Sequence, residues 1–273
     1  MSIQPRNIRR IIGLTWMVMV FIFLFLPIFV IIAYSFNGGR NLYVWQEFST
    51  RWYAVALDNP RVLSALAVSL KAAAINALIA VSLGMLAGLT LARRKGRWLV
   101  PYVMLIFVVL GTPELVSAIG QMIWLDRLGI FDGITRLSIG HSVFNVAVVT
   151  LIVRARAEGM GEQLEQAAAD LGAVPWRAFV TITLPLLFPA VMAGLLLSFT
   201  FSLDNVITSV FVQRPGTTTL PLYILSSFKA GLKGDVAAIA VIMLGVSILA
   251  IAIAALLLNR GARRGSVMGG AMG

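Results

Sequence analysis

The sequence predicts an all-α membrane protein with about six transmembrane helices. Of its 273 residues, 59% are hydrophobic and only 12% are charged, whereas soluble domains carry about 25% charged residues. The hydrophobic residues fall into six runs, most of them near or above the roughly 20 apolar residues that a spanning helix needs. Basic residues cluster at the ends of these runs, where they act as topological anchors.

The six candidate spans alternate with polar segments along the chain. The first is too long for a signal-peptide core and lacks a convincing cleavage site, so we expect it to be retained. In the third, Pro113 is expected to kink or break the helix, because proline removes a backbone donor. The fourth is short for a span. The spans are expected at residues 11–36, 62–92, 100–123, 138–153, 186–212 and 236–258.

Charge bias supports the fourth span and predicts that both termini are cytoplasmic. With six spans, thirteen Lys and Arg residues lie on the inner side and eight on the outer side. Without the fourth span, Arg154, Arg156, Arg177 and the basic C-terminus would lie outside, against the positive-inside rule. The inner residues are Arg6, Arg9, Arg10, Arg93, Arg94, Lys95, Arg97, Arg154, Arg156, Arg177, Arg260, Arg263 and Arg264.

Three regions are expected along the chain. Residues 1–61 form an N-terminal transmembrane helix followed by an outer interfacial segment rich in aromatic residues. In that segment Ser49 or Thr50 is expected to cap a short helix that stops at Asp58-Asn59-Pro60. Residues 62–260 form the membrane core, interrupted by a polar segment at about 158–182. Residues 261–273 are small and are expected to form a flexible cytoplasmic tail.

The polar segment between the fourth and fifth spans is predicted to contain two short helices. Helix propensity is high over residues 162–171, and Gly172 is suited to a left-handed helix end. Pro175 prevents simple continuation. A second short helix is expected from Trp176 to about Ile182, before Pro185 breaks into the fifth span. From these features alone, an ordinary amphipathic helix lying on the bilayer surface is an equal alternative.

The spacing within this segment resembles the cytoplasmic loop of ABC-importer permeases, E-A-A-x3-G-x9-I-x-L-P. Ala167, Ala168 and Gly172 match, and Ile182 and Pro185 match the end of the pattern, whereas Gln166 stands where the family has glutamate. The resemblance implies a type I ABC-importer permease fold and a docking site for a cytoplasmic ATPase dimer. The implied docking residues are Glu165, Gln166, Ala167, Ala168, Asp170, Gly172, Ile182 and Pro185.

The chain has no G-x-x-x-x-G-K-[ST] phosphate loop. We therefore expect it to be a translocation subunit and not an enzyme, with ATP and Mg used by the partner ATPase and with no cofactor or metal bound by this chain. The resemblance further implies a second, similar permease chain in a heterodimer, an extracytoplasmic solute-binding protein, and a place in the bacterial inner membrane. The net charge of +11 does not indicate nucleic-acid binding, because the basic residues flank the apolar runs.

Further motifs resemble the second permease subunit of spermidine/putrescine importers. They are Gly111-Thr112-Pro113-Glu114-Leu115-Val116, His141-Ser142-Val143-Phe144-Asn145, the run 198–208, and the run 215–223. The resemblance implies a polyamine or a related cationic or zwitterionic solute. In that group a second acidic residue often follows the aspartate, but here Asn205 does, which argues against a fully charged polyamine. Opines, amino acids, sugars and ferric complexes stay open as alternative solutes.

Polar residues inside the spans predict a translocation pathway, because a central Asp or Lys costs roughly 2.5–3.5 kcal/mol and is usually functional. Asp204 lies deep in the fifth span, and helical spacing places Ser202, Asn205 and Thr208 along one hydrophilic side with it. The alternative is that these groups bond to neighbouring helices. Glu114 beside Pro113 is equally suited to a pathway or to a structural cap.

Two other functions fit the same composition. In a secondary transporter, Asp204 and Glu114 would carry protons, and transport would follow the proton gradient and not ATP. In a membrane scaffold without transport, the polar side of the fifth span would have no role. His141 is the only histidine of the chain, so no histidine metal site is expected, and a hydrogen bond near the membrane interface is its expected role.

Overall fold

The computed structural model describes residues 5–39, 44–229, 231 and 234–269. In this part of the chain the regular structure is helical, and an isolated antiparallel bridge joins Asn37 to Phe48. A 3₁₀ turn spans Arg97–Leu99 and a π-helix spans Phe179–Thr183. The α-helices are α1 (Pro5–Ser35), α2 (Arg51–Asp58), α3 (Pro60–Arg93), α4 (Val100–Gly111), α5 (Glu114–Arg127), α6 (Gly133–Glu158), α7 (Gln163–Asp170), α8 (Pro175–Ala178), α9 (Leu184–Leu203), α10 (Ile207–Val212), α11 (Leu220–Lys229) and α12 (Gly234–Gly269).

The expectation of about six spans is confirmed. Within the described residues, five helices are long and apolar enough to cross a membrane, and α4 with α5 makes a sixth if the pair counts as one span. The chain is bent by 111° between these two helices. Because α5 begins directly after Pro113, the predicted break in the third span is confirmed. The fourth span is longer than predicted, because α6 runs for 26 residues.

The chain forms two compact units. One combines Met1–Val62 with Ile224–Leu244, and the other combines Leu63–Tyr223 with Gly245–Gly273. In the first unit, buried Asn37 holds the described part of the aromatic segment. Its Nδ2 donates to Val44 O at 2.8 Å, and its Oδ1 accepts from the backbone of Gly39 and Gln46. The predicted short helix is α2, and Ser49 Oγ accepts from the first amide of that helix.

In the second unit, small residues allow α3, α6 and α9 to approach closely. A side chain at Gly84 or Gly194 would meet Val149, and one at Gly88 would meet the backbone oxygen of Thr150. Val149 is fully buried, so its side chain fills the gap that these glycines leave. Small residues are the usual means of close helix packing in membranes, where lipid supplies no hydrophobic drive between helices.

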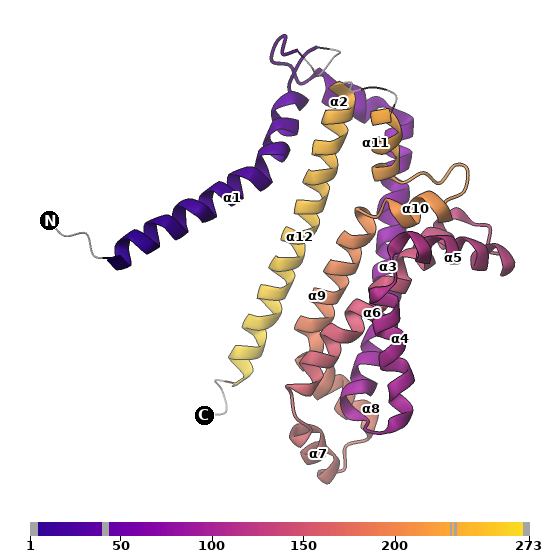
Figure 1. Ribbon diagram of the computed structural model, residues 1–273. Helices are drawn as coiled ribbons and strands as arrows, with labels where there is room; N and C mark the ends of the chain where they lie inside the picture. Colours follow the sequence, from indigo (N-terminus) through magenta and orange to yellow (C-terminus); the bar gives the residue numbers. More distant parts are fainter. Residues whose placement is uncertain (1–4, 40–43, 230, 232–233, 270–273) are drawn as a thin grey trace. The chain divides into compact units, whose positions relative to one another are not determined.

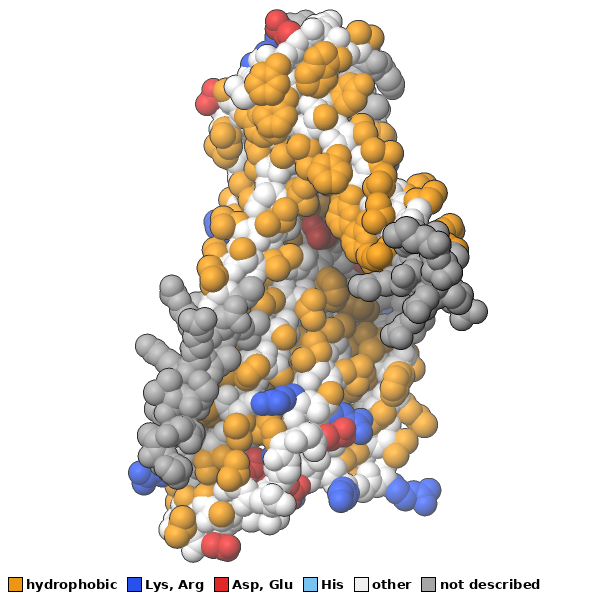
Figure 2. Space-filling model, turned by 90° about the vertical axis from the view of Figure 1, so that its left-hand side faces the viewer, with side chains coloured by type: hydrophobic (Ala, Val, Ile, Leu, Met, Phe, Trp, Pro, Cys, Tyr) orange, Lys and Arg blue, Asp and Glu red, His pale blue; other side chains and the backbone are white. Residues whose placement is uncertain are grey.

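The two ends of the second unit carry different structures. Figure 1 places α7 and α8 at one end of α3, α6 and α9, and α5 and α10 towards the other end. Hydrophobic side chains cover much of the face in Figure 2, and Lys and Arg side chains gather towards the lower end, where Figure 1 places α7.

The structure defines the start of α6 and the end of α12. At the start of α6, Asp132 accepts from the hydroxyl and the backbone N–H of Thr135, and these bonds lower the pKa of its carboxyl group. At the other end, α12 continues to Gly269, so the described residues from 261 onward have helical backbone. The flexible cytoplasmic tail over residues 261–273 stays a prediction. Residues 270–273 lie outside the described residues.

Candidate functional site

The predicted docking segment folds as two short helices joined by a tight turn. α7 ends in a Schellman motif, in which Ala173 N donates to Ala168 O and Gly172 N donates to Ala169 O, both at 2.9 Å. Gly172 has φ of +80°, a left-handed conformation that glycine adopts without steric cost. The prediction that Gly172 ends this helix is therefore confirmed.

The α7–α8 segment leaves most of its predicted docking residues free of the rest of the chain. No residue of α7 is buried. Gln166, Ala167 and Asp170 are exposed, and Ala168 is half-buried. Sequence reasoning missed two exposed apolar residues beside them, since Leu171 is 89% exposed and Trp176 is 72% exposed. Large apolar side chains exposed together are typical of surfaces that contact another protein or a membrane.

Glu165 differs from the other predicted docking residues because its side chain is engaged within the chain. Its Oε1 accepts from Arg93 Nη2 at 2.9 Å and from Thr183 Oγ1 at 2.8 Å. Arg93 is the last residue of α3, and Thr183 is the last residue of the π-helix before α9. This carboxylate therefore joins α7 to two membrane helices.

Pro185 does not break the chain between the docking segment and the fifth span. Helical structure continues from Pro175 to Leu203, with the π-helix directly before Pro185, and Leu184 N donates to Phe179 O five residues back. The proline ring has no N–H and would collide with the carbonyl four residues earlier in a regular α-helix. The wider π turn removes that collision, and it holds Ile182 half-buried.

At the other end of the unit, a cavity of about 440 Å³ lies among α4, α5, α6, α9 and α10. Its charged lining residues are Glu114 and Asp204, and it has no lysine or arginine. Phe144 and Phe201 contribute two rings whose centroids lie 6.2 Å apart. The lining consists of Val109, Thr112, Glu114, Ser117, Gln121, Gly140, His141, Phe144, Asn145, Phe201, Asp204, Asn205, Val206, Ile207 and Thr208.

The fifth span ends earlier than the sequence predicts. α9 stops at Leu203, Asp204 follows it, and α10 begins at Ile207. Asp204 is therefore at a helix end and not deep in a helix, and the continuous hydrophilic side predicted through residue 208 is wrong. Asp and Asn have weak helix propensity and favour caps, but the apolar run around them hid this signal.

The predicted pathway residues nevertheless gather at this break. Asn205 Oδ1 accepts from the backbone N–H of Thr208 at 3.0 Å, which caps α10, and Asn205 Nδ2 donates to Glu114 Oε1 at 2.8 Å. Thr208 Oγ1 lies 3.3 Å from the same carboxylate oxygen. An aspartate at 205 would cap α10 but would donate no hydrogen bond to Glu114. Ser202 is buried in the last turn of α9 and does not line the cavity.

His141 joins the two sides of the break. It lies in the third turn of α6, deeper than predicted, and is 3% exposed. Its Nδ1 lies 2.7 Å from Ser202 Oγ, and its Nε2 lies 3.1 Å from Ser209 Oγ. Because Ser209 Oγ donates to Asn205 O, it accepts from His141 Nε2–H, and the network assigns Nδ1 as the acceptor from Ser202.

The cavity also presents buried hydrogen-bond acceptors. The side-chain oxygens of Gln121 and Asn145 are buried, and neither has a hydrogen-bond partner among the described residues. Asn145 Nδ2 donates to Asn76 Oδ1 at 3.1 Å, and Asn76 Nδ2 donates to Ser198 O at 2.8 Å. α3, α6 and α9 are thereby joined beside the cavity. Unpaired buried acceptors favour a ligand that donates hydrogen bonds.

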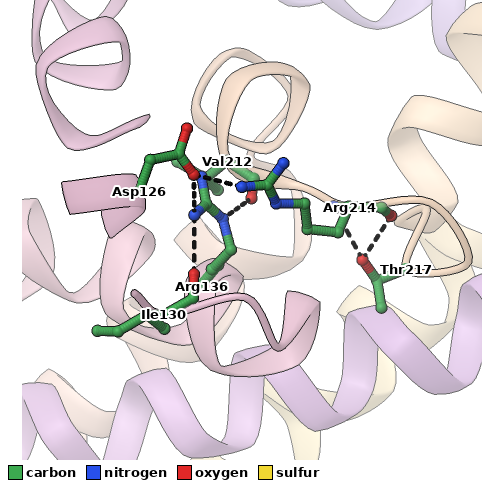
Figure 3. A network of polar contacts seen from close by, with 6 residues as sticks. All are labelled: Asp126, Ile130, Arg136, Val212, Arg214 and Thr217. Atoms are coloured by element: carbon green, nitrogen blue, oxygen red, sulfur yellow. Dashed lines mark hydrogen bonds and ion pairs between the residues drawn. The ribbon is translucent and has the colours of Figure 1, made fainter. Parts of the chain in front are cut away.

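Beyond the cavity, a buried arginine joins α5, α6 and α10 (Figure 3). Arg136 is 1% exposed, and its Nε donates to Val212 O at 2.7 Å. Its Nη1 donates to Asp126 Oδ1 at 2.6 Å and to Ile130 O at 2.9 Å. Arg214 binds the same Asp126 oxygen. Arg136 and Arg214 are two of the eight basic residues that the sequence predicts on the outer side, and the structure shows that Arg136 is a buried structural cation.

Comparison with known proteins shows which family the chain belongs to. The model of the family described as "binding-protein-dependent transport system inner membrane component" matches residues 80–264. The spermidine/putrescine transport system permease protein PotC of Escherichia coli K12 is 36% identical over 260 residues, covering 95% of this chain and 98% of the relative. The putrescine transport system permease protein PotI of the same strain is 34% identical over 232 residues, covering 82% and 83%. The chain belongs to this permease family.

Solved structures support the fold. A bacterial ABC transporter involved in the import of alginate has a TM-score of 0.72 at 16% identity, covering 95% of this chain and 98% of that one. The alginate transporter in complex with its periplasmic protein has a TM-score of 0.68 at 15% identity, covering 95% and 96%. The permease therefore has the ABC-importer permease fold. In this family the permease is one subunit, and the ATPase is another.

The family match contains both the α7–α8 segment and the cavity of this permease. Sequence motifs predicted the glycine turn at Gly172 and singled out Glu114, Asp204, Asn205 and Thr208, which line the cavity. The hydrogen bonding expected of His141 is present, but its partners Ser202 and Ser209 lie 61 and 68 positions away. Asn145 likewise contacts Asn76 across 69 positions, and the sequence does not identify such distant partners. A polar residue repeated among apolar helices was the available signal, but it does not show which neighbour that residue contacts.

Proposed function

We propose that this permease conducts a small cationic or zwitterionic solute, of the polyamine class, through the cavity at the α9–α10 break. The carrying observation is that Glu114 and Asp204 are its charged lining residues and that no lysine or arginine balances them. A carboxylate attracts a cation more strongly where the effective dielectric is below that of water. Aromatic faces such as those of Phe144 and Phe201 also attract ammonium groups.

The names of the relatives support the same solute class. PotC is named for spermidine and putrescine, and PotI for putrescine. In this chain Asn205 contributes an amide that donates to Glu114, so the cavity holds two carboxylates and not three. A solute with one or two positive charges fits this balance better than a more highly charged one.

The α7–α8 segment is proposed to be the docking site of a cytoplasmic ATPase dimer. Its support is the exposed surface formed by Gln166, Ala167, Leu171 and Trp176 around the Gly172 turn. A second, similar permease chain is proposed to complete the pathway, and an extracytoplasmic binding protein is proposed to deliver the solute. A solved neighbour in complex with a periplasmic protein supports the latter.

The proposed location is the bacterial inner membrane with both termini in the cytoplasm. The charge bias of thirteen to eight basic residues supports this orientation. A reporter fused after Leu258 is expected on the cytoplasmic side, and one inserted at the exposed turn near Leu128 is expected outside. A C-terminal reporter on the outer side would contradict the proposal.

The solute proposal is tested by the Asp204→Asn substitution, which keeps the size and removes the charge. Uptake of putrescine and spermidine by the assembled importer is expected to fall, while the ATPase still co-purifies with the permease. Asp58→Asn is the matched control, because Asp58 is an exposed carboxylate at the end of α2. Unchanged uptake of every amine would remove Asp204 from the pathway, and loss of assembly would make its role structural.

A further inference from the structure

The position of α7 depends on very few contacts. It is an eight-residue helix, and none of its residues is buried. A hollow of about 260 Å³ lies beside it, lined by Leu89 and Arg93 of α3, by Ala169 of α7, and by Phe179 of the π-helix among others. Little apolar surface of α7 is therefore buried against the membrane helices.

The carboxylate of Glu165 supplies the connection that packing does not. One oxygen, Oε1, accepts from Arg93 at 2.9 Å and from Thr183 at 2.8 Å. The side chains of Arg93 and Glu165 are 16% and 29% exposed, and Thr183 is 3% exposed. An ion pair shielded to this degree is screened less by salt than a pair on an open surface.

Both partners of Glu165 lead towards the cavity. Thr183 directly precedes α9, and α9 ends directly before Asp204. Arg93 ends α3, and Asn76 of that helix contacts Asn145 at the cavity. A displacement of α7 is thus passed to two helices that border or support the cavity wall.

We infer that Glu165 is a positioning residue that couples the docking helix to α3 and α9. This inference rests on the proposed docking of an ATPase at α7–α8. Glu165 holds α7 in a fixed position relative to α3 and α9, so that movement of a docked ATPase moves the helices that border the cavity. The partner of Glu165 is Arg93 of the same chain and not a residue of the ATPase.

The positional part is tested on the purified full-length chain, without ATPase or solute. The chain has no natural cysteine, so spin labels at Lys95→Cys and Asp170→Cys, both exposed positions, report one distance. Glu165→Arg and Arg93→Glu are each expected to broaden that distance distribution, and the double exchange is expected to narrow it again. Glu162→Arg and Arg94→Glu are matched controls at exposed positions. An unchanged distribution in the single variants overturns the inference.

The coupling part is tested in the reconstituted importer. Each single exchange is expected to lower solute-stimulated ATP hydrolysis and uptake by roughly tenfold, the order expected for losing a hydrogen bond to a charged group. The ATPase is expected to co-purify throughout, and the double exchange is expected to recover most of the activity. Loss of co-purification that the double exchange fails to restore would assign Glu165 to docking and overturn the inference. If α7 responds in the label experiment but wild-type uptake needs no ATP, the proposed function fails separately.

Discussion

The α7–α8 segment precedes α9 and the α9–α10 break follows it, but the two regions are stabilised by different kinds of hydrogen bond. Around Gly172 the structure is fixed by hydrogen bonds between residues close in sequence, such as Ala173 to Ala168. At the α9–α10 break, the contacts come from distant residues. Glu114 reaches Asn205 across 91 positions, and His141 reaches Ser209 across 68.

Because of this difference, substitutions in the two regions are expected to affect stability and transport differently. Long-range hydrogen bonds among buried groups are costly to break, because a donor or acceptor that stays buried loses its partner. An exposed segment such as α7 has little buried surface to lose. Substitutions that break these buried bonds are therefore expected to destabilise the chain, whereas substitutions in α7–α8 are expected to change transport with little effect on folding.

The largest loss of stability is expected for Arg136→Ala. The substitution leaves the carbonyl oxygens of Val212 and Ile130 without their donor, at about 1–3 kcal/mol for each buried group left unpaired. The apparent melting temperature of the purified chain in detergent measures the effect. Arg127→Ala is the control, because Arg127 is exposed at the end of α5. Equal melting temperatures for the two variants would show that the Arg136 network contributes no stability.

A smaller loss is expected for Asn205→Asp. The cap of α10 is retained, but a carboxylate replaces the amide that donates to Glu114. Because this bond to a charged group is solvent-exposed, its loss corresponds to at most about 1.5 kcal/mol, and the repulsion between the two like charges adds to it. The apparent melting temperature of the purified variant, compared with that of wild type at neutral pH, measures this loss. A variant that is as stable as wild type at neutral pH would refute the assigned contact.

The smallest effect on stability, with a large effect on uptake, is expected for Gly172→Val. A side chain at φ of +80° costs roughly 1–2 kcal/mol locally, and apart from the two adjacent residues no described part of the chain lies within 4 Å of the added Cβ. Uptake should be lost while the chain stays inserted. Gly172→Asn sharpens the result, since Asn tolerates this backbone conformation. If Asn restores uptake, backbone geometry is decisive, whereas loss in both variants indicates close approach of the partner. Normal uptake by the Val variant would contradict the docking assignment.

Sequence reasoning was most accurate where neighbouring residues decide the structure. Pro113 and Gly172 end helices because of their own backbone chemistry, and both predictions are confirmed. It was wrong at Asp204, where a long apolar run outweighed the capping signal of Asp204-Asn205. It also predicted a helix break at Pro185, but the π-helix before this proline keeps the chain helical there. Neither error is visible from hydropathy, because both outcomes depend on where backbone hydrogen bonds find partners.

By itself, the sequence determined that the chain is a helical membrane protein with about six spans, that Gly172 ends a short helix between the fourth and fifth spans, and which family the chain resembles. Length, apolar content and the local chemistry of glycine and proline are sufficient for these properties. The tertiary structure alone decided that Arg136 is buried, that Glu165 binds Arg93 and Thr183, and that His141 bridges the α9–α10 break. Each of these contacts joins residues far apart along the chain, and only the packing of the helices brings their polar atoms within hydrogen-bonding distance.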